Sequence, residues 1–122
     1  MMSNCLGHAE PGQEKFYVAF GDHNVRILTA DGVRALPLRL DLSNHSPTGF
    51  SWGYGGSGPA QLALALLADA LKDDERALRL HQPFKWQVTA MIKRPCWVLS
   101  VGEVREVAID LENLDQTLCT QG

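Results

Sequence analysis

The run Gly53-Tyr54-Gly55-Gly56-Ser57-Gly58 is the part of the sequence whose residue types and spacing come closest to a chemical site. It satisfies G-x-G-x-x-G, the pattern of a loop whose amides, with a helix N-terminus, bind a pyrophosphate. A dinucleotide fold then needs a helix and a second parallel strand, whereas two helical segments follow here. Pro59 and Ala60 also stand where a phosphate-binding P-loop requires Lys and Ser or Thr. The pattern alone therefore does not predict a nucleotide site.

A catalytic role for this run would depend on Ser57 as the nucleophile. The G-x-S-x-G pattern of hydrolases fails, because Pro59 falls on the final glycine. The base nearest in sequence is His45, which we instead expect to anchor its loop by hydrogen bonds. No acid, base and nucleophile converge, so the sequence favours binding over chemistry and predicts no catalytic residue.

The simplest interpretation of the run is structural. Glycine permits a turn with positive φ, Ser57 or Gly58 caps the next helix, and Pro59 takes its first position. An alternative stays open, in which free amides at Ser57, Gly58 and Ala60 attract an anion or a partner's carboxylate.

Aromatic residues alternate just before the run, at Phe50, Trp52 and Tyr54. On an extended segment they would share one face, where they could stack on a base, although a core role is favoured. Trp86, beside Lys85, has the same two interpretations. The candidate ligand- or partner-binding residues are His45, Trp52, Tyr54, Gly55, Gly56, Ser57 and Gly58.

Cysteine and histidine are spread too widely to form a metal site. Cys5, Cys96 and Cys119 form no Cys-x-x-Cys pair, and the four histidines show no ligand spacing. We expect free thiols, as in a reducing compartment, with Cys96 as a small core residue. The sequence predicts no metal and no cofactor.

The elements that position these residues begin with strands. Aromatic and β-branched residues predict strands over Lys15–Phe20, Asn24–Thr29 and Val33–Leu36, which pair as an antiparallel meander. Asp31-Gly32 is expected at the second turn, as a dipeptide with positive φ at both residues. Pro37 lacks an amide donor, so the third strand ends there or lies at an edge.

Helices follow a turn-rich loop that spans residues 38 to 51. From Pro59 to Leu71 the chain is nearly all Ala and Leu, which predicts a buried helix that is apolar on every side. A second helix starts after Lys72-Asp73, with apolar positions from Ala77 to Met91. Pro83 should kink or restart it.

The C-terminal part predicts one more strand and one more helix. Trp97-Val98-Leu99 is a short apolar strand candidate. Ser100 and Glu103 have the Ser-x-x-Glu spacing of a capping box, which opens a short helix over 101 to 109. The fold class is thus α+β: a meander, the glycine-rich turn, a buried helix, a kinked helix and a short C-terminal helix.

Composition places these elements in one domain. The chain has 122 residues, 45% of them hydrophobic, and a formal charge of -3. We expect a loose leader over 1–13, a domain over 14–112 and a tail over 113–122. No basic surface for nucleic acid, no membrane-spanning run and no signal peptide are evident, so we expect a cytoplasmic protein.

A long block of the chain resembles a known family. The stretch from Asn44 to Ala65, NHSPTGFSWGYGGSGPAQLALA, is similar to the signature of an uncharacterised family of small prokaryotic and phage proteins, and Phe84-Lys85-Trp86 is similar to a second block. The resemblance covers about residues 16 to 109. It brings a domain of unknown function and no catalytic residues, and it implies a phage or mobile-element context.

The function that follows is a non-enzymatic interaction protein with an unidentified protein partner. The resemblance extends this to action on a host protein complex, such as a defence system. The alternative is a small-molecule or nucleotide-binding enzyme that uses the glycine-rich turn. The oligomeric state stays open.

Overall fold

The computed structural model describes residues 14–121 and, for the last helix, side chains up to residue 114. The expected leader over 1–13 lies outside the described residues. The domain limits at 14 and 112 stay predictions.

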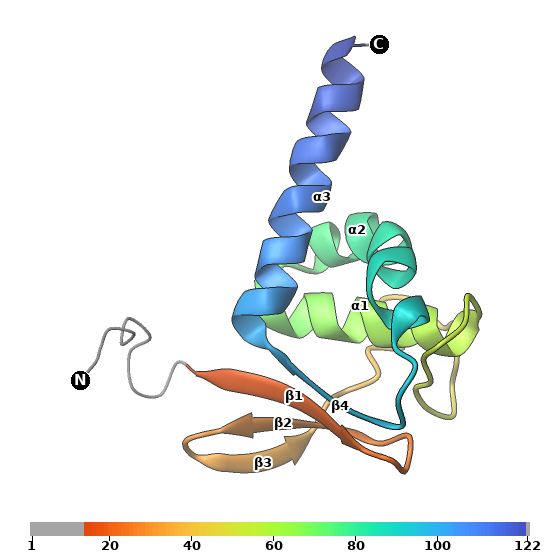
Figure 1. The fold of residues 1–122 in the computed structure, drawn as a ribbon, viewed down its shortest axis with the longest axis vertical. Helices are drawn as coiled ribbons and strands as arrows, with labels where there is room; N and C mark the ends of the chain where they lie inside the picture. Colours follow the sequence, from red (N-terminus) through yellow and green to blue (C-terminus); the bar gives the residue numbers. More distant parts are fainter. Residues whose placement is uncertain (1–13, 122) are drawn as a thin grey trace.

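Four antiparallel strands form one sheet, in the order β3-β2-β1-β4 (Figure 1). The strands are β1 (Lys15–Phe20), β2 (Val25–Thr29), β3 (Gly32–Ala35) and β4 (Cys96–Ser100). The predicted meander is confirmed, with β2 and β3 each within one residue of the expected limits. β3 ends two residues before Pro37 and lies at an edge of the sheet. Both features agree with the lack of an amide donor at Pro37.

The turn between β2 and β3 lies one residue earlier than expected. Thr29 pairs with Gly32, so Ala30 and Asp31 are the central residues. Gly32 takes a positive φ of 137°, whereas Asp31 does not. Glycine adopts such a φ without the steric cost that a Cβ would bring. The expectation of positive φ at both Asp31 and Gly32 was wrong.

The C-terminal strand candidate joins the same sheet. β4 pairs with β1, far away in sequence, and Trp97 lies opposite Ala19. Strand alternation puts Trp97 and Leu99 on the helix side and Cys96 on the other side, where it is exposed. Cys96 is therefore not the core residue that its apolar neighbours predicted.

Helix α1 (Ser57–Leu71) and helix α2 (Asp74–Gln87) pack against each other as a hairpin, with α1 between α2 and the sheet (Figure 1). α1 is buried on every side, including the five predicted positions Leu62, Leu64, Ala65, Leu66 and Leu67. Asp73 caps α2 by accepting a hydrogen bond from the Arg76 amide.

Helix α2 runs through Pro83 as one continuous element, so the expected kink amounts to a slight bend. It ends at Gln87, and the short 3-10 helix η2 (Thr89–Met91) follows. Met91 is exposed, because the apolar period that predicted its burial stops where α2 ends.

Helix α3 (Val101–Gln121) is longer than the predicted short helix over 101 to 109. It takes in residues 113 to 121, which were expected as a tail, because no Gly or Pro follows Gly102 until Gly122. The capping box is confirmed: Ser100 N donates to Glu103 Oε1 at 2.8 Å, and Glu103 N donates to Ser100 Oγ at 3.0 Å.

A carboxylate on α1 ties the helices to the sheet. Asp69 accepts hydrogen bonds from the Tyr17 hydroxyl at 2.6 Å and from Lys15 Nζ at 2.9 Å. Burial opposes the ionisation of Asp69, but these two donors outweigh it and lower its pKa. Burial and the bond to Asp69 both raise the pKa of Tyr17, so its hydroxyl stays a donor. One face of the sheet is thus fixed under the helices.

Candidate functional site: the glycine-rich turn

The turn, residues 51 to 58, is held against η2 by its backbone. Gly53 adopts φ of 90°, which confirms the predicted positive φ in the glycine run. Its amide donates to Thr89 O at 2.9 Å, and a Cβ would lie 2.8 Å from Ile92 O. Only glycine satisfies both the dihedral angle and this close backbone approach.

The start of α1 differs from the expected cap. Gly56 is the N-cap, without a side-chain hydrogen bond, and Pro59 is third in the helix rather than first. Pro59 is still acceptable there, since amides of the first turn have no helical acceptor. The Ala60 amide donates to Gly56 O at 3.2 Å, so it is not open to a ligand. The binding interpretation had required this amide to be free.

Two aromatic rings lie directly on the glycines. The Trp86 indole, from α2, covers Gly55, and the Tyr54 ring folds back over Gly56. A Cβ at either glycine would overlap the ring above it. The Tyr54 hydroxyl is held at 2.7 Å from Ser51 Oγ. These glycines therefore serve the placement of two rings as well as the path of the chain.

Both rings face solvent, and two lysines contact the turn beside them. Tyr54 is 53% exposed and Trp86 is 59% exposed. Lys85 Nζ lies 4.4 Å from the centre of the Trp86 ring and donates to Gly55 O at 3.4 Å. Lys93 Nζ donates to Gly53 O at 3.1 Å. We call this region the turn surface: residues 53 to 58 with Lys85, Trp86 and Lys93.

The three alternating aromatics do not share a face, because the segment bends instead of forming a strand. Phe50 is in the core, and Tyr54 is on the turn surface. Trp52 stacks on His23 at 5.1 Å between ring centres, meets Trp97 edge-on, and donates its Nε1 proton to a backbone carbonyl. Trp52 thus links the turn to the β1–β2 connection and to β4.

His45 bonds to a second histidine rather than to Ser57. Its Nε2 lies 3.0 Å from His81 Nε2. His81 Nδ1 lies 2.7 Å from Leu78 O, a pure acceptor, so Nδ1 carries a proton and Nε2 of neutral His81 accepts from His45. Burial lowers the pKa of His81, and the nearby His45 and Lys85 lower it further.

Beneath His45, the buried side chain of Gln61 organises the loop that leads to the turn. Its Oε1 accepts hydrogen bonds from the amides of His45 and Ser46, at 2.7 and 2.9 Å. Its Nε2 donates to Leu38 O and Ser43 O, at 2.7 and 3.0 Å. All four hydrogen-bonding positions of the amide are used, so one α1 residue fixes the path of the loop.

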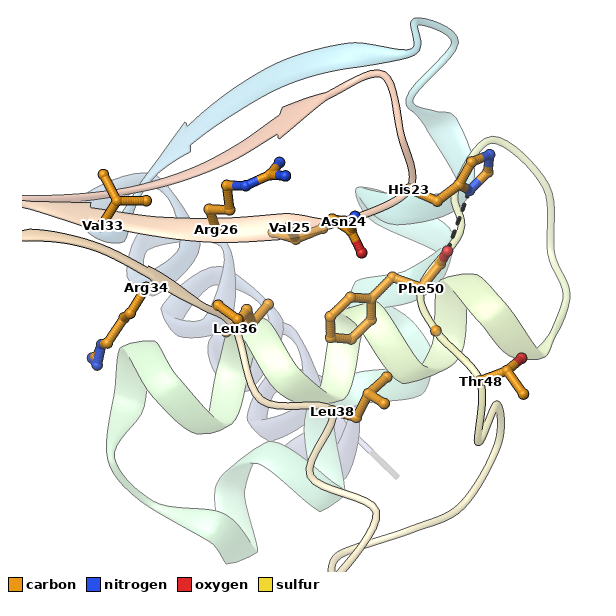
Figure 2. Close-up of a pocket in the computed structure, with 12 residues that line it drawn as sticks. His23, Asn24, Val25, Arg26, Val33, Arg34, Leu36, Leu38, Thr48 and Phe50 are labelled. Atoms are coloured by element: carbon orange, nitrogen blue, oxygen red, sulfur yellow. Dashed lines mark hydrogen bonds between the residues drawn. The ribbon is translucent and has the colours of Figure 1, made fainter.

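A hollow of about 430 Å³ lies beside β3 and the loop at Phe50 (Figure 2). Figure 2 shows Arg26 and Arg34 pointing to opposite sides of their strands, so the two guanidinium groups do not converge on one anion. His23 is engaged at its rim with Phe50 O, at 3.3 Å. The lining offers no acid, base and nucleophile set.

Sequence reasoning treated Trp86 as ambiguous and did not single out His81 or Gln61. Their roles depend on partners 16 to 36 residues away, such as the His45–His81 contact, and no local pattern carries such a pairing. Within residues 14–114, no three His, Cys, Asp or Glu side chains gather as metal ligands. No helix in the described part is both long and apolar enough to cross a bilayer.

Fold and site together define a small α+β protein, with three helices on one face of a four-stranded antiparallel sheet and an aromatic turn at the start of α1. More particularly, the chain belongs to the DUF6166 family, a family of unknown function, whose model matches residues 17–110. No curated protein and no solved structure matches the chain.

Proposed function

We propose that this protein is a non-enzymatic interaction protein that binds a partner protein through the turn surface. The observation that carries the proposal is the pair of rings, Tyr54 and Trp86, each more than half exposed and each seated on a glycine. Tyr and Trp dominate the energetics of protein interfaces. Rings held in place before binding lose little conformational entropy when a partner docks.

The charges near the rings indicate the chemistry of the partner. Lys93 is exposed at the turn, and the positive end of the α1 dipole opens beside Ser57, while Lys85 is buried against Trp86 and Gly55. A partner segment with apolar side chains flanked by Asp or Glu complements this surface. The formal charge of the whole chain is -3, so the cationic character is local to the turn.

The alternative, a nucleotide-binding or small-molecule enzyme, has less support. Ala60 N is already bonded to Gly56 O, and Pro59 has no amide proton to offer a phosphate. No acid, base and nucleophile converge at the turn or in the hollow beside β3.

The biological setting of the proposal comes from the family resemblance. We place the protein in the cytoplasm, in a phage or mobile-element context, with a host protein complex such as a defence system as its partner. The signature around the turn suggests this setting.

Quantitative affinity capture tests the proposal. Wild type and the exposed α3 control Ile109→Ala should retain the same partner from a host lysate. Trp86→Ala and Tyr54→Ala should each reduce retention by roughly tenfold or more, as for hot-spot residues. A partner held equally by all four proteins contradicts a role for the turn surface.

Gly55→Ala gives a sharper variant, since it keeps every ring but displaces Trp86 from its seat. We expect near-normal folding, altered tryptophan emission and weaker capture. Amide chemical shifts during titration with phosphate and nucleotides separate the alternative. Saturable shifts at Ser57, Gly58 and Ala60 with a nucleotide would favour the enzyme instead.

A further inference from the structure

The sheet has a second face, which no helix of residues 14–121 covers. The pairing register aligns its side chains in three rows: Val33-Leu28-Phe16-Ser100, then Ala35-Arg26-Val18-Val98, then Phe20-Cys96. Strand alternation turns these positions away from Tyr17 and Ile27, which face the helices. In Figure 1 the three helices all lie on the other side of the sheet. We call these ten positions the outer face.

The outer face is apolar, and its largest exposed side chains lie around Val18, which is itself only 5% exposed. Val33 is 63% exposed and Phe20 and Val98 are both 59% exposed, on three different strands. Soluble monomers rarely leave contiguous apolar patches of this kind uncovered, and such patches mark interaction sites.

Charge on the outer face is almost absent. Arg26 is its only charged residue, and its guanidinium is already paired with Asp22 at 3.0 Å and lies 5.2 Å from the centre of the Phe20 ring. Two copies of this face can therefore meet without like-charge repulsion and without burying an unpaired charge.

The size of the face matches a small dimer interface. Strands about 4.8 Å apart, with about 3.3 Å per residue, give four strands of this length a flat area of roughly 300 Å². Side-chain relief raises the accessible area to roughly 500 Å² per copy, so a face-to-face pair buries about 1,000 Å², the lower limit for a specific interface.

We infer that the outer face is a dimer interface that binds a second copy of this chain. The two sheets stack face to face about 10 Å apart, related by a twofold axis, as in a β-sandwich. A sheet face whose one charge is already paired is complementary to its own copy, and an interface of this size is typical of weak, reversible association. The turn surface lies outside this face, so each copy keeps its own turn.

Sedimentation equilibrium of the full chain, from low to high micromolar concentration, tests this inference. Wild type should pass from monomer to dimer, and Val98→Glu and Val33→Glu, at opposite edges of the face, should stay monomeric. Ile109→Glu, at an apolar site on α3 that is 50% exposed, should dimerise like wild type. Circular dichroism establishes whether each variant folds. Because two separate sites are changed, the test still decides if one of the two glutamate variants fails to fold.

Three outcomes would overturn the inference. One is a wild type that stays monomeric throughout, and another is a dimer that both glutamate variants leave intact. The third is a monomer that associates only after deletion of residues 1–13, which would assign the face to that segment. Partner capture by Val98→Glu should match wild type, so failure here is separate from failure of the turn-surface proposal.

Discussion

At the scale of single residues, the least conventional feature is the contact between His45 and His81. Only one proton fits between two Nε2 atoms 3.0 Å apart, and the Leu78 carbonyl already fixes a proton on His81 Nδ1. A charged His81 would turn an N–H toward the His45 donor. The pair therefore favours neutral His81, as its lowered pKa also indicates.

This pair predicts a pH dependence of stability. The folded pKa of His81 lies below the unfolded value of about 6.5, so the unfolded chain binds more protons and stability rises with pH. The contribution of neutral His81 to the free energy of unfolding is complete above pH about 6.5, and it is lost as the pH falls toward the folded pKa. The free energy of unfolding of His81→Gln, measured by urea denaturation at several pH values across this range, should change less steeply with pH than that of wild type. Equal slopes would contradict the assignment.

Gln61 carries the second residue-scale prediction. Gln61→Leu leaves two amides and two carbonyls of the loop without their partner, and each buried unmet group costs about 1–3 kcal/mol. We expect a loss of about 3 kcal/mol or more in the free energy of unfolding. Gln87→Leu, on the exposed end of α2, is the matched control and should change stability by less than about 0.5 kcal/mol.

At the scale of elements, the start of α3 follows directly from β4. Ser100 ends the strand and caps the helix, so one residue sets the angle between two elements. The reciprocal bond from Ser100 N to Glu103 satisfies a second backbone donor.

The capping box gives the element-scale prediction. Ser100→Ala should cost about 1 kcal/mol, because the Glu103 amide loses its acceptor. Since the two bonds act together, Ser100→Ala with Glu103→Ala should cost less than the sum of the single changes. Thermal unfolding measures all three, with the exposed Glu106→Ala as control. Strict additivity would show that the box does not act as a unit.

At the scale of the whole molecule, the chain closes on itself. β1 near the start pairs with β4 near the end, and one core joins the sheet, the loop at Phe50 and all three helices. No part of the described chain has a core of its own, so it should unfold as a unit.

Urea denaturation checks this prediction of cooperativity. Far-UV circular dichroism reports the helices, and tryptophan emission reports Trp52 and Trp97 between sheet and turn, with Trp86 on α2. The two curves should coincide with one midpoint. Separate midpoints would instead show that the sheet and the helical hairpin unfold independently.

The sequence alone determined the features that depend on neighbours along the chain. Aromatic and β-branched residues predicted β1 and β2, the Ala and Leu run predicted the burial of α1, and Ser100 with Glu103 predicted the start of α3. These signals are local: strand propensity, helix propensity and a cap three residues from its partner. Where local signals were weak, as at Met91 and beyond Ile109, the predicted limits were wrong.

The tertiary structure decided everything that joins distant segments. It packed Trp86 on Gly55 and brought His81 within hydrogen-bond distance of His45. It also supplied loop backbone partners to the Gln61 amide and paired β4 with β1. Each of these contacts forms only when several elements pack at once, so no local pattern encodes it. The sequence therefore located the glycine-rich turn, and the packing of α2 against it made the turn an exposed aromatic surface.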